Sequence, residues 1–238
     1  MKAYANWTVL PHSTFRKLEE NLWCIEGSLP SMPLKRNTVV AKLASGELVV
    51  HNALAVDDAT RAELESWGKP AHLVVGNGWH RLDAKVFKDR YPALRIYCAN
   101  GSRKRVAEVV PVDGCYGGGS SDFPTDPSVR MIALEGVPVE GVLEVKSQAG
   151  TTLVFNDAVF NQPHLPGVFG AVYRLIGSSG GPRVTNLVKL AMVKDKRAFR
   201  AHLERLADTP RLTRIIVAHG AILDDNPAER LRQIARAI

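Results

Sequence analysis

Two apolar runs rich in β-branched residues each bring one ionisable side chain to the end of an expected strand. Residues 151–157 (TTLVFND) end at Asp157, and residues 214–220 (RIIVAHG) carry His219 near their end. Buried strands have this composition, and such a strand delivers a single polar group to the rim of its sheet. A carboxylate and an imidazole delivered in this way are ligand types of metal sites. They equally suit a hydrogen-bonded structural pair in which one side chain fixes the tautomer of the other, and the residues alone leave both alternatives open.

Two further histidines lie near expected strand ends. Residues 47–51 (ELVVH) end at His51, and His80 follows the strand expected at residues 72–75 after a short glycine-containing loop. Nitrogen and oxygen donors from three or four strand ends suit a site for a single metal ion. We therefore predict one common pocket whose donors are His51, His80, Asp157 and His219, and whose lining includes Asn52, Asn77 and Trp79.

The other histidines and one serine motif are weaker candidates. His164 lies in a loop beyond Asp157, whereas His12, His72 and His202 are expected at the surface or at strand edges. Residues 177–181 (GSSGG) satisfy a GxSxG pattern, and Asp195 and His219 follow in the order of a hydrolase triad. A nucleophile elbow needs a strand before the serine and a helix after it, but the preceding residues are expected to be helical and Pro182 follows directly. The sequence favours a flexible connector.

The elements that position these residues alternate between strands and helices in the first half of the chain. A hairpin is expected from the β-rich runs 37–43 and 47–51. Residues 57–60 (DDAT) supply a predicted N-cap for a helix that ends at about Trp67, before Gly68 and Pro70. Then follow a strand at 72–75, a helix at 84–90, a strand at 94–98 and a helix from Ser102. This alternation predicts a sheet that is at least partly parallel.

The second half contains another group of strands and then helices. We expect the glycine-rich residues 111–127 to be an active-site-type loop within one domain rather than a linker. The expected elements after it are strands at 129–134, 141–147 and 151–157, helices at 168–176 and 185–206, a strand at 214–218 and a helix from Pro227 capped by Asn226. Two β-rich halves with helices outside predict an α/β (α+β) fold, a four-layer αββα sandwich formed by one domain over residues 1–238.

This order of elements resembles the metallo-β-lactamase fold from about Leu22 to the end of the chain. Residues 48–52 (LVVHN) look like the early strand that opens onto the site, and residues 72–80 (HLVVGNGWH) occupy the place of the strand and loop with the family's HxHxDH motif. The strands of Asp157 and His219 look like those supplying the family's metal-bridging aspartate and last histidine. The segment from Val74 to Pro92 looks closer to an uncharacterised, motif-poor branch of the superfamily.

The ligand motif of that family is missing from this chain. Aligned without gaps, its four ligand positions fall on Asn77, Trp79, Arg81 and Leu82. Tryptophan and leucine donate no ligand atom, and the fixed charge of arginine repels a cation. Residues 136–147 also lack the histidine expected before Asp157. We therefore predict that a dinuclear zinc site is absent, and that any cofactor is one Zn, Mn or Fe ion.

The resemblance implies a degenerate hydrolase with a mononuclear site, in which water activated by the metal attacks an ester or phosphoester bond. The alternative is a non-catalytic binding or scaffold protein of the same fold without metal, since the fold does not decide the function. In either case the expected partner is a small molecule, and the sequence leaves the oligomeric state open.

Composition and charge narrow the partners further. The net charge of +7 comes from basic residues that are spread along the chain, with one tight cluster at residues 102–105, so no nucleic-acid partner is expected. No apolar window reaches the roughly 18 residues of a membrane span, and no signal peptide is recognised, so we expect a cytoplasmic protein without a membrane partner. The cysteines Cys24, Cys98 and Cys115 follow no CxxC spacing, which is typical of a reducing compartment. Cys24 and Cys98 are expected to be buried, and Cys115 to lie in a loop as a candidate exposed thiol.

Overall fold

The computed structural model describes residues 2–238, and Met1 of the predicted domain lies outside the described residues. The first half of the chain forms an eight-stranded sheet whose strands lie side by side in sequence order. Its strands β4 to β7 run parallel, and the remaining neighbours are antiparallel. The strands are β1 (Arg16–Glu19), β2 (Leu22–Leu29), β3 (Met32–Lys42), β4 (Glu47–His51), β5 (Lys69–Val74), β6 (Arg95–Ala99), β7 (Gly114–Gly117) and β8 (Ser120–Ser121).

The second half forms a four-stranded sheet in the order β14-β11-β10-β9. Strands β11 and β14 are parallel although the helices of the C-terminal half separate them in sequence. The strands are β9 (Val129–Ala133), β10 (Gly141–Lys146), β11 (Thr151–Val154) and β14 (Leu212–Ile216). A separate antiparallel pair, β12 (Phe160–Gln162) and β13 (Gly181–Arg183), extends beyond the end of β11.

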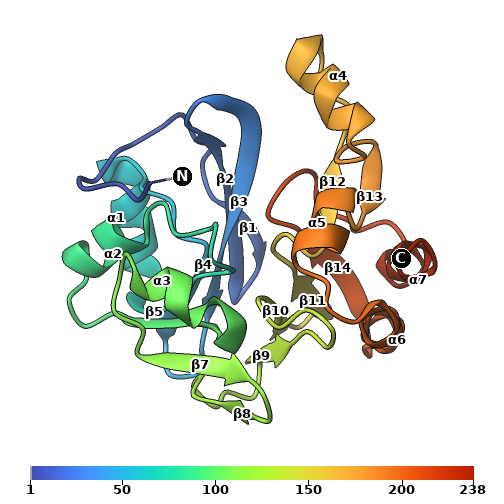
Figure 1. Cartoon of the computed structure of the whole chain (residues 1–238). Helices are drawn as coiled ribbons and strands as arrows, with labels where there is room; N and C mark the ends of the chain where they lie inside the picture. The colour runs from blue at the N-terminus through green and yellow to red at the C-terminus, as the bar shows by residue number, and fades with distance from the viewer. Residues whose placement is uncertain (1) are drawn as a thin grey trace.

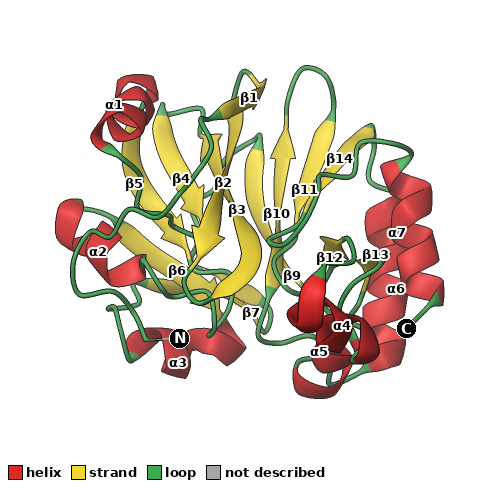
Figure 2. Cartoon of the chain, turned by 90° about the horizontal axis from the view of Figure 1, so that it is seen from above, coloured by secondary structure: helices red, strands yellow, loops and turns green. Residues whose placement is uncertain are grey.

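The helices cover the outer faces of the two sheets (Figures 1 and 2). Helices α1 (Asp58–Trp67), α2 (Ala84–Arg90) and α3 (Arg103–Ala107), the last preceded by a 3-10 turn at Asn100–Ser102, lie outside the first sheet. Helices α6 (Lys196–Ala207) and α7 (Pro227–Arg236) lie outside the second sheet. Two shorter helices, α4 (Gly167–Leu175) and α5 (Asn186–Ala191), lie at one end, and α4 projects away from the body in Figure 1. The result is the predicted four-layer αββα sandwich.

Strand alternation assigns side chains to three layers of core. On β4, Val49 joins the cluster between the two sheets, whereas Leu48 and Val50 join the cluster under α1 to α3. On the second sheet, Val154 faces the first sheet and Leu153 faces α5 to α7. Successive residues of a strand point to opposite faces, so an uninterrupted apolar run fills two cores at once. Because the central cluster draws on both sheets, the two halves of the chain share a core.

Several expected elements differ from the observed ones. The glycine-rich residues 111–127 are not only a loop, because they contain the short strands β7 and β8. The helix expected over 185–206 is two helices, since Asp195 accepts a hydrogen bond from Ala198 N–H and starts α6 anew. Asn226 makes no side-chain cap and adopts a left-handed conformation before Pro227, which occupies the first turn of α7. Strands β1, β2, β12 and β13 had not been expected.

Three predicted surface residues are buried instead. Cys115 lies in β7, with its thiol against the Arg103 side chain. His72 lies within β5 beside the Tyr97 and Phe123 rings, and His202 accepts the Glu135 N–H from within α6. Cys24 and Cys98 are buried as expected. Within residues 2–238 no helix combines the length and the apolar character that a membrane crossing requires.

Candidate metal centre

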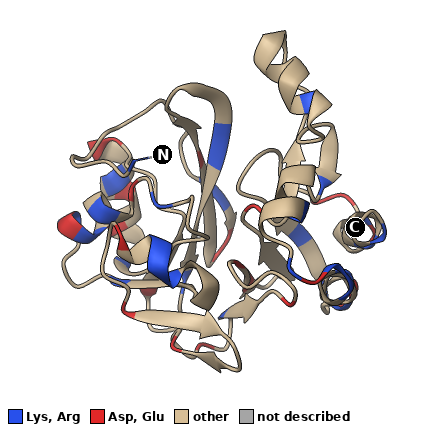
Figure 3. Ribbon diagram, in the orientation of Figure 1, with Lys and Arg blue, Asp and Glu red and all other residues tan. Residues whose placement is uncertain are grey.

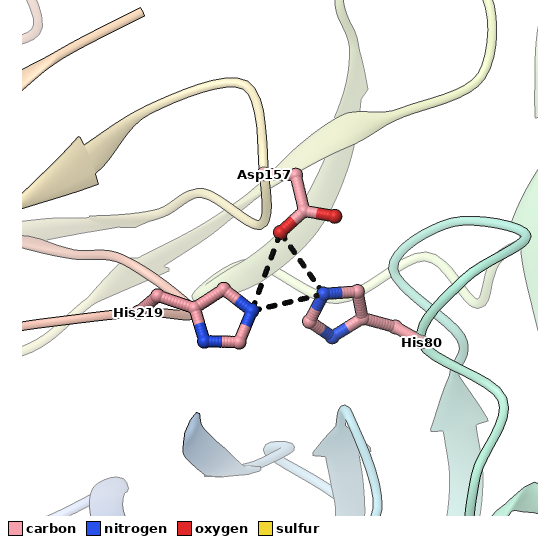
Figure 4. Close-up of side chains that lie close together, drawn as sticks. All are labelled: His80, Asp157 and His219. Atoms are coloured by element: carbon pink, nitrogen blue, oxygen red, sulfur yellow. Dashed lines mark hydrogen bonds and ion pairs between the residues drawn. The ribbon is translucent and has the colours of Figure 1, made fainter. Parts of the chain in front are cut away.

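Three of the four predicted donors meet at one edge of the two sheets. His80 lies in the loop after β5, Asp157 follows the end of β11, and His219 follows the end of β14. Strands β11 and β14 are parallel, so their carboxyl ends deliver both residues to the same edge. Figure 4 shows the two imidazole rings and the carboxylate pointing toward one another.

The three distances between the donor atoms are similar. Asp157 Oδ1 lies 2.9 Å from His80 Nε2 and 3.5 Å from His219 Nε2. The two Nε2 atoms lie 3.3 Å apart. Zinc ligands at 2.0–2.1 Å in a tetrahedron are separated by roughly 3.3 Å. The three donors therefore fit one triangular face of such a coordination sphere without rearrangement.

The main chain of β3 fixes the tautomer of His219. The Nδ1–H group donates to the Lys35 carbonyl at 2.7 Å, which leaves the Nε2 lone pair facing His80 and Asp157. Burial lowers the pKa of His219, so the ring is neutral and this lone pair is available. Asn37 holds the same loop by donating to the carbonyls of Val217 and Gly220. A backbone acceptor behind a histidine is the usual outer partner of a metal ligand.

Glu140 holds the loop that carries Asp157. Its buried carboxylate accepts the backbone N–H groups of Asn156, Asp157 and Ala158 at 2.8–3.1 Å. Asn77 connects this carboxylate to the site, because its side-chain amide donates to both Glu140 and Asp157. The Asn77 side-chain oxygen also accepts the Trp79 N–H in the loop of His80. Glu140, Asn77 and the main chain of Trp79 thus connect the loop of His80 to the loop of Asp157.

The two carboxylates have opposite pKa shifts. Burial raises the pKa of Glu140, and the neighbouring Asp157 charge adds to the rise, to about 8. Burial also acts to raise the pKa of Asp157, but His80, and after it the hydrogen bond from Asn77, holds it below its ordinary value. Asp157 is therefore the more acidic of the two groups. Its closest partner is His80 at 2.9 Å, and His219, the other member of the structural pair considered from the sequence, lies 3.5 Å away.

The fourth predicted donor, His51, does not join the other three. The group of side chains that can share one ion contains His80, Asp157 and His219. His51 is 1% exposed, and its Nε2 has no hydrogen-bond partner within residues 2–238. Burial, together with the charge of His80, lowers its pKa to about 3. His51 therefore lies near the site as a neutral buried side chain.

A cavity of about 380 Å³ opens onto the three donors. Trp79, His80, Asp157 and His219 line it, whereas His51, Asn52 and Asn77, which were also expected in the pocket, are buried outside its lining. Asn52 instead donates to Asn156 and accepts the Gly76 N–H. The walls are mainly apolar, and they consist of Leu29, Met32, Leu34, Leu82, Phe160, Tyr173, Leu187, Val188, Ala191 and Met192, with the polar Arg36, Ser178 and Thr185 among them.

The residues at the lost motif positions have other roles. The Arg81 guanidinium pairs with Glu108, and Leu82 is a buried part of the cavity wall. Trp79 is exposed, and the Arg105 guanidinium lies over its ring. These side chains leave His80 as the single donor that this loop brings to the cluster.

The GxSxG segment does not form a hydrolase triad. Ser179 Oγ lies 3.0 Å from His164 Nδ1, while Asp195 caps α6 and His219 belongs to the cluster of three donors. His164 is exposed and is not part of the cluster. The connector predicted from the sequence is formed here by β13 and the turns around it.

Sequence reasoning missed two acidic side chains near the site. Glu140 follows residues 137–139 (VPV), where Pro138 argues against a strand, so the signal that identified Asp157 is absent there. Asp83 forms a buried ion pair with the cavity-lining Arg36 at 2.5 Å. Nothing in the sequence pairs Arg36 with Asp83, because the contact depends on how β3 meets the loop before α2.

Comparisons with known proteins connect this geometry to solved structures. No family model and no curated protein matches the chain. The metallo-β-lactamase from Erythrobacter litoralis, crystallised with β-mercaptoethanol in its active site, is similar with a TM-score of 0.60 and 13% identity, over 94% of this chain and 96% of that one. The DIM-1 metallo-β-lactamase exposed to ceftazidime is similar with a TM-score of 0.64 and 13% identity, over 97% of this chain and 99% of that one. At this identity the likeness concerns the fold alone.

Proposed function

The chain has the metallo-β-lactamase fold, an αββα sandwich, and from this premise we propose that it is a hydrolase whose site holds one metal ion between His80, Asp157 and His219. The observation that carries the proposal is the lone pair of His219 Nε2. The Lys35 carbonyl fixes the tautomer that turns this lone pair toward the other two donors. The donor set of two imidazoles and one carboxylate suits Zn, Mn or Fe.

When bound, such an ion lowers the pKa of water and polarises a carbonyl or phosphoryl oxygen. Residues of the chain hold the donor side chains in place. Asn77 holds the Asp157 carboxylate through its second oxygen, and the Phe160 ring stacks against His219. The apolar walls exclude bulk water from the donors and accept an apolar part of the substrate. We therefore propose an ester or phosphoester with an apolar group as the substrate class.

A non-catalytic binding function is the second candidate, and one contact favours it. The 2.9 Å distance between His80 and Asp157 is that of a direct hydrogen bond, so the pair is satisfied without an ion. A protein that uses the same cavity only to bind a small apolar molecule needs nothing more from these side chains.

Thermal melts with and without Zn²⁺, Mn²⁺ and Fe²⁺ separate the two candidates. A ligand that binds only the folded state at a hundred times its Kd raises the melting temperature of a chain of this size by roughly 5–10 °C. We expect this rise with at least one of the ions in the parent protein and in the control variant His164→Ala, whose histidine is exposed and outside the cluster.

We expect no rise in His219→Ala or Asp157→Asn. Elemental analysis of protein purified without chelator should find at most one equivalent of metal. Two tightly held equivalents would contradict the single-ion proposal, and flat melts with all three ions would favour the binding protein.

A further inference from the structure

Helix α4 is apolar on nearly all sides, yet only Gly170 of its residues is buried. A helix of this kind is normally covered by protein or by lipid. Val168 is 83% exposed and Leu175 is 87% exposed, and both lie on the part of the chain that projects from the body in Figure 1. Gly170 lies against the Leu165 carbonyl, where a side chain would not fit, so the helix is held to its own entry turn.

The exposed apolar residues continue from α4 into α5. Leu187 and Leu190 on α5 are 61% and 83% exposed. We call Val168, Val172, Leu175, Ile176, Leu187 and Leu190 together the apolar rim. These six are most of the large exposed hydrophobic residues, the others being Val9 and Trp79, and Trp79 itself lines the cavity. Single exposed hydrophobic residues are common, but a contiguous group marks a binding surface.

The rim lies beside the mouth of the cavity. Leu187 belongs both to the rim and to the cavity wall, and Tyr173 of α4 lines the same cavity. The opposite wall comes from the tip of the β2–β3 hairpin, residues 29–34, which is uncharged except at its flanks. The cavity thus opens between two apolar projections.

The segment that carries the rim has charges of one sign. Residues 158–194 contain no Asp or Glu, but they include Arg174, Arg183, Lys189 and Lys194. Figure 3 shows this distribution, with no acidic residue on α4, α5 or the β12–β13 pair. Within residues 2–238, neither Arg174 nor Lys194 has a carboxylate in ion-pair distance, since both are absent from the ion pairs that other cations form. Exposed aliphatic residues bordered by cations complement an anionic lipid surface.

We propose that the apolar rim binds an anionic lipid bilayer and so places the mouth of the cavity against the lipid surface. A second copy of the chain fits less well, because a twofold interface would bring the same cations of two copies together without an acidic partner. The two aromatic side chains of α4, Phe169 and Tyr173, are half-buried and stack on each other. The exposed rim itself therefore offers nucleic-acid bases no free ring on which to stack. This inference departs from the absence of a membrane partner expected from the sequence, where exposure is not visible. It does not depend on metal binding.

Vesicle co-sedimentation tests the inference with the full chain. Vesicles of phosphatidylcholine mixed with phosphatidylglycerol should bind the parent protein, and vesicles of phosphatidylcholine alone should bind it much less. The double variant Val168→Ser/Leu175→Ser should bind the mixed vesicles at least ~10-fold more weakly, because it loses two inserting side chains. Arg174→Glu should weaken binding by about 10-fold and make it less sensitive to salt.

Matched variants away from the rim should bind as the parent does. Val9→Ser removes an exposed hydrophobic residue elsewhere, and Lys69→Glu reverses a charge at the end of β5 opposite to the site. All variants change exposed residues, so their melting temperatures should match the parent and show that each is folded. Equal binding by the rim variants and the parent would overturn the proposal, as would no binding to mixed vesicles. Self-association that the rim variants abolish, without vesicle binding, would overturn it in favour of a second copy.

Discussion

At the scale of single residues, the site combines neutral and ionised groups at short range. His219 is neutral because it is buried, and Asp157 is ionised because His80 and Asn77 stabilise its charge. His51 is almost fully buried, and its Nε2 has no hydrogen-bond partner within residues 2–238. A buried neutral histidine makes the free energy of unfolding depend on pH.

His51 should make the protein less stable in acid. Its pKa is about 3 in the folded state against 6.5 in an unfolded chain, so the unfolded chain binds the proton first. The contribution of neutral His51 to the free energy of unfolding is fully present above pH 6.5 and is lost as the pH falls toward 3. Between pH 7 and pH 5 this group should remove about 2 kcal/mol from the free energy of unfolding.

Urea denaturation at several pH values measures this effect as a slope. His51→Gln should flatten the dependence between pH 7 and pH 5 by that amount, whatever its absolute stability. His164→Gln, at an exposed histidine, is the matched control variant. An unchanged slope in His51→Gln would mean that protons reach His51 in the folded protein.

At the scale of elements, each of the three candidate ligands lies in the loop after a strand, and its position depends on the contacts that hold this loop. Glu140, which lies just before β10, accepts three successive backbone N–H groups after β11. Asn37 on β3 holds the loop after β14 by donating to two of its backbone carbonyls. The donors therefore converge because neighbouring strands hold the loops in place.

Glu140→Ala should loosen the Asp157 loop. It leaves three buried N–H groups without an acceptor, and each such loss costs about 1–3 kcal/mol unless water enters. We expect the free energy of unfolding to fall by about 3 kcal/mol or more. The rise of the melting temperature with metal should also disappear, because Asp157 is no longer held.

The control for this variant is Glu135→Ala, which removes an exposed carboxylate paired with Arg205. It should change the free energy of unfolding by no more than about 0.5 kcal/mol. If Glu140→Ala kept both the stability and the metal response of the parent, the loop would be held by other contacts.

These elements also show what the sequence reveals and what it does not. Strand β4 and helix α2 were predicted with their observed bounds, because an apolar run and clear start and stop signals surround each. Strand β2 was missed because Glu26 and Gly27 interrupt its apolar pattern, and β12 and β13 are too short for any pattern. His51 was placed in the wrong environment because no local signal tells which core the last side chain of a strand will face. The likeness to metallo-β-lactamases was predicted from element order and is confirmed for the fold.

At the scale of the whole molecule, the two sheets unfold together if their shared core is the main source of stability. The central cluster contains Val49 and Tyr97 from the first sheet and Leu143 and Val154 from the second. All four tryptophans lie in the first half of the chain, so their fluorescence reports on that half alone. Far-ultraviolet circular dichroism reports on both halves.

Urea transitions followed by fluorescence and by circular dichroism should therefore coincide. Leu143→Ala, in the second sheet, should shift both transitions together by about 2–5 kcal/mol, because Leu143 is fully buried between the sheets. Two separate transitions, or a fluorescence transition that ignores Leu143→Ala, would show two independent domains. The exposed Leu190→Ala is the control and should leave both transitions in place.

The hydrogen bond from His219 to the Lys35 carbonyl has a consequence for divergence and for mutational scanning. Its acceptor belongs to the main chain, so the identity of residue 35 is free to drift as long as β3 keeps its register. The three donors to Glu140 in the Asp157 loop are main-chain groups as well. The main-chain contacts that orient the candidate ligands therefore require no conserved side chain in an alignment. In an alanine scan across β3, Lys35→Ala would keep the hydrogen bond to His219. A chain of this architecture tolerates extensive replacement of its side chains while the geometry around its ligands persists.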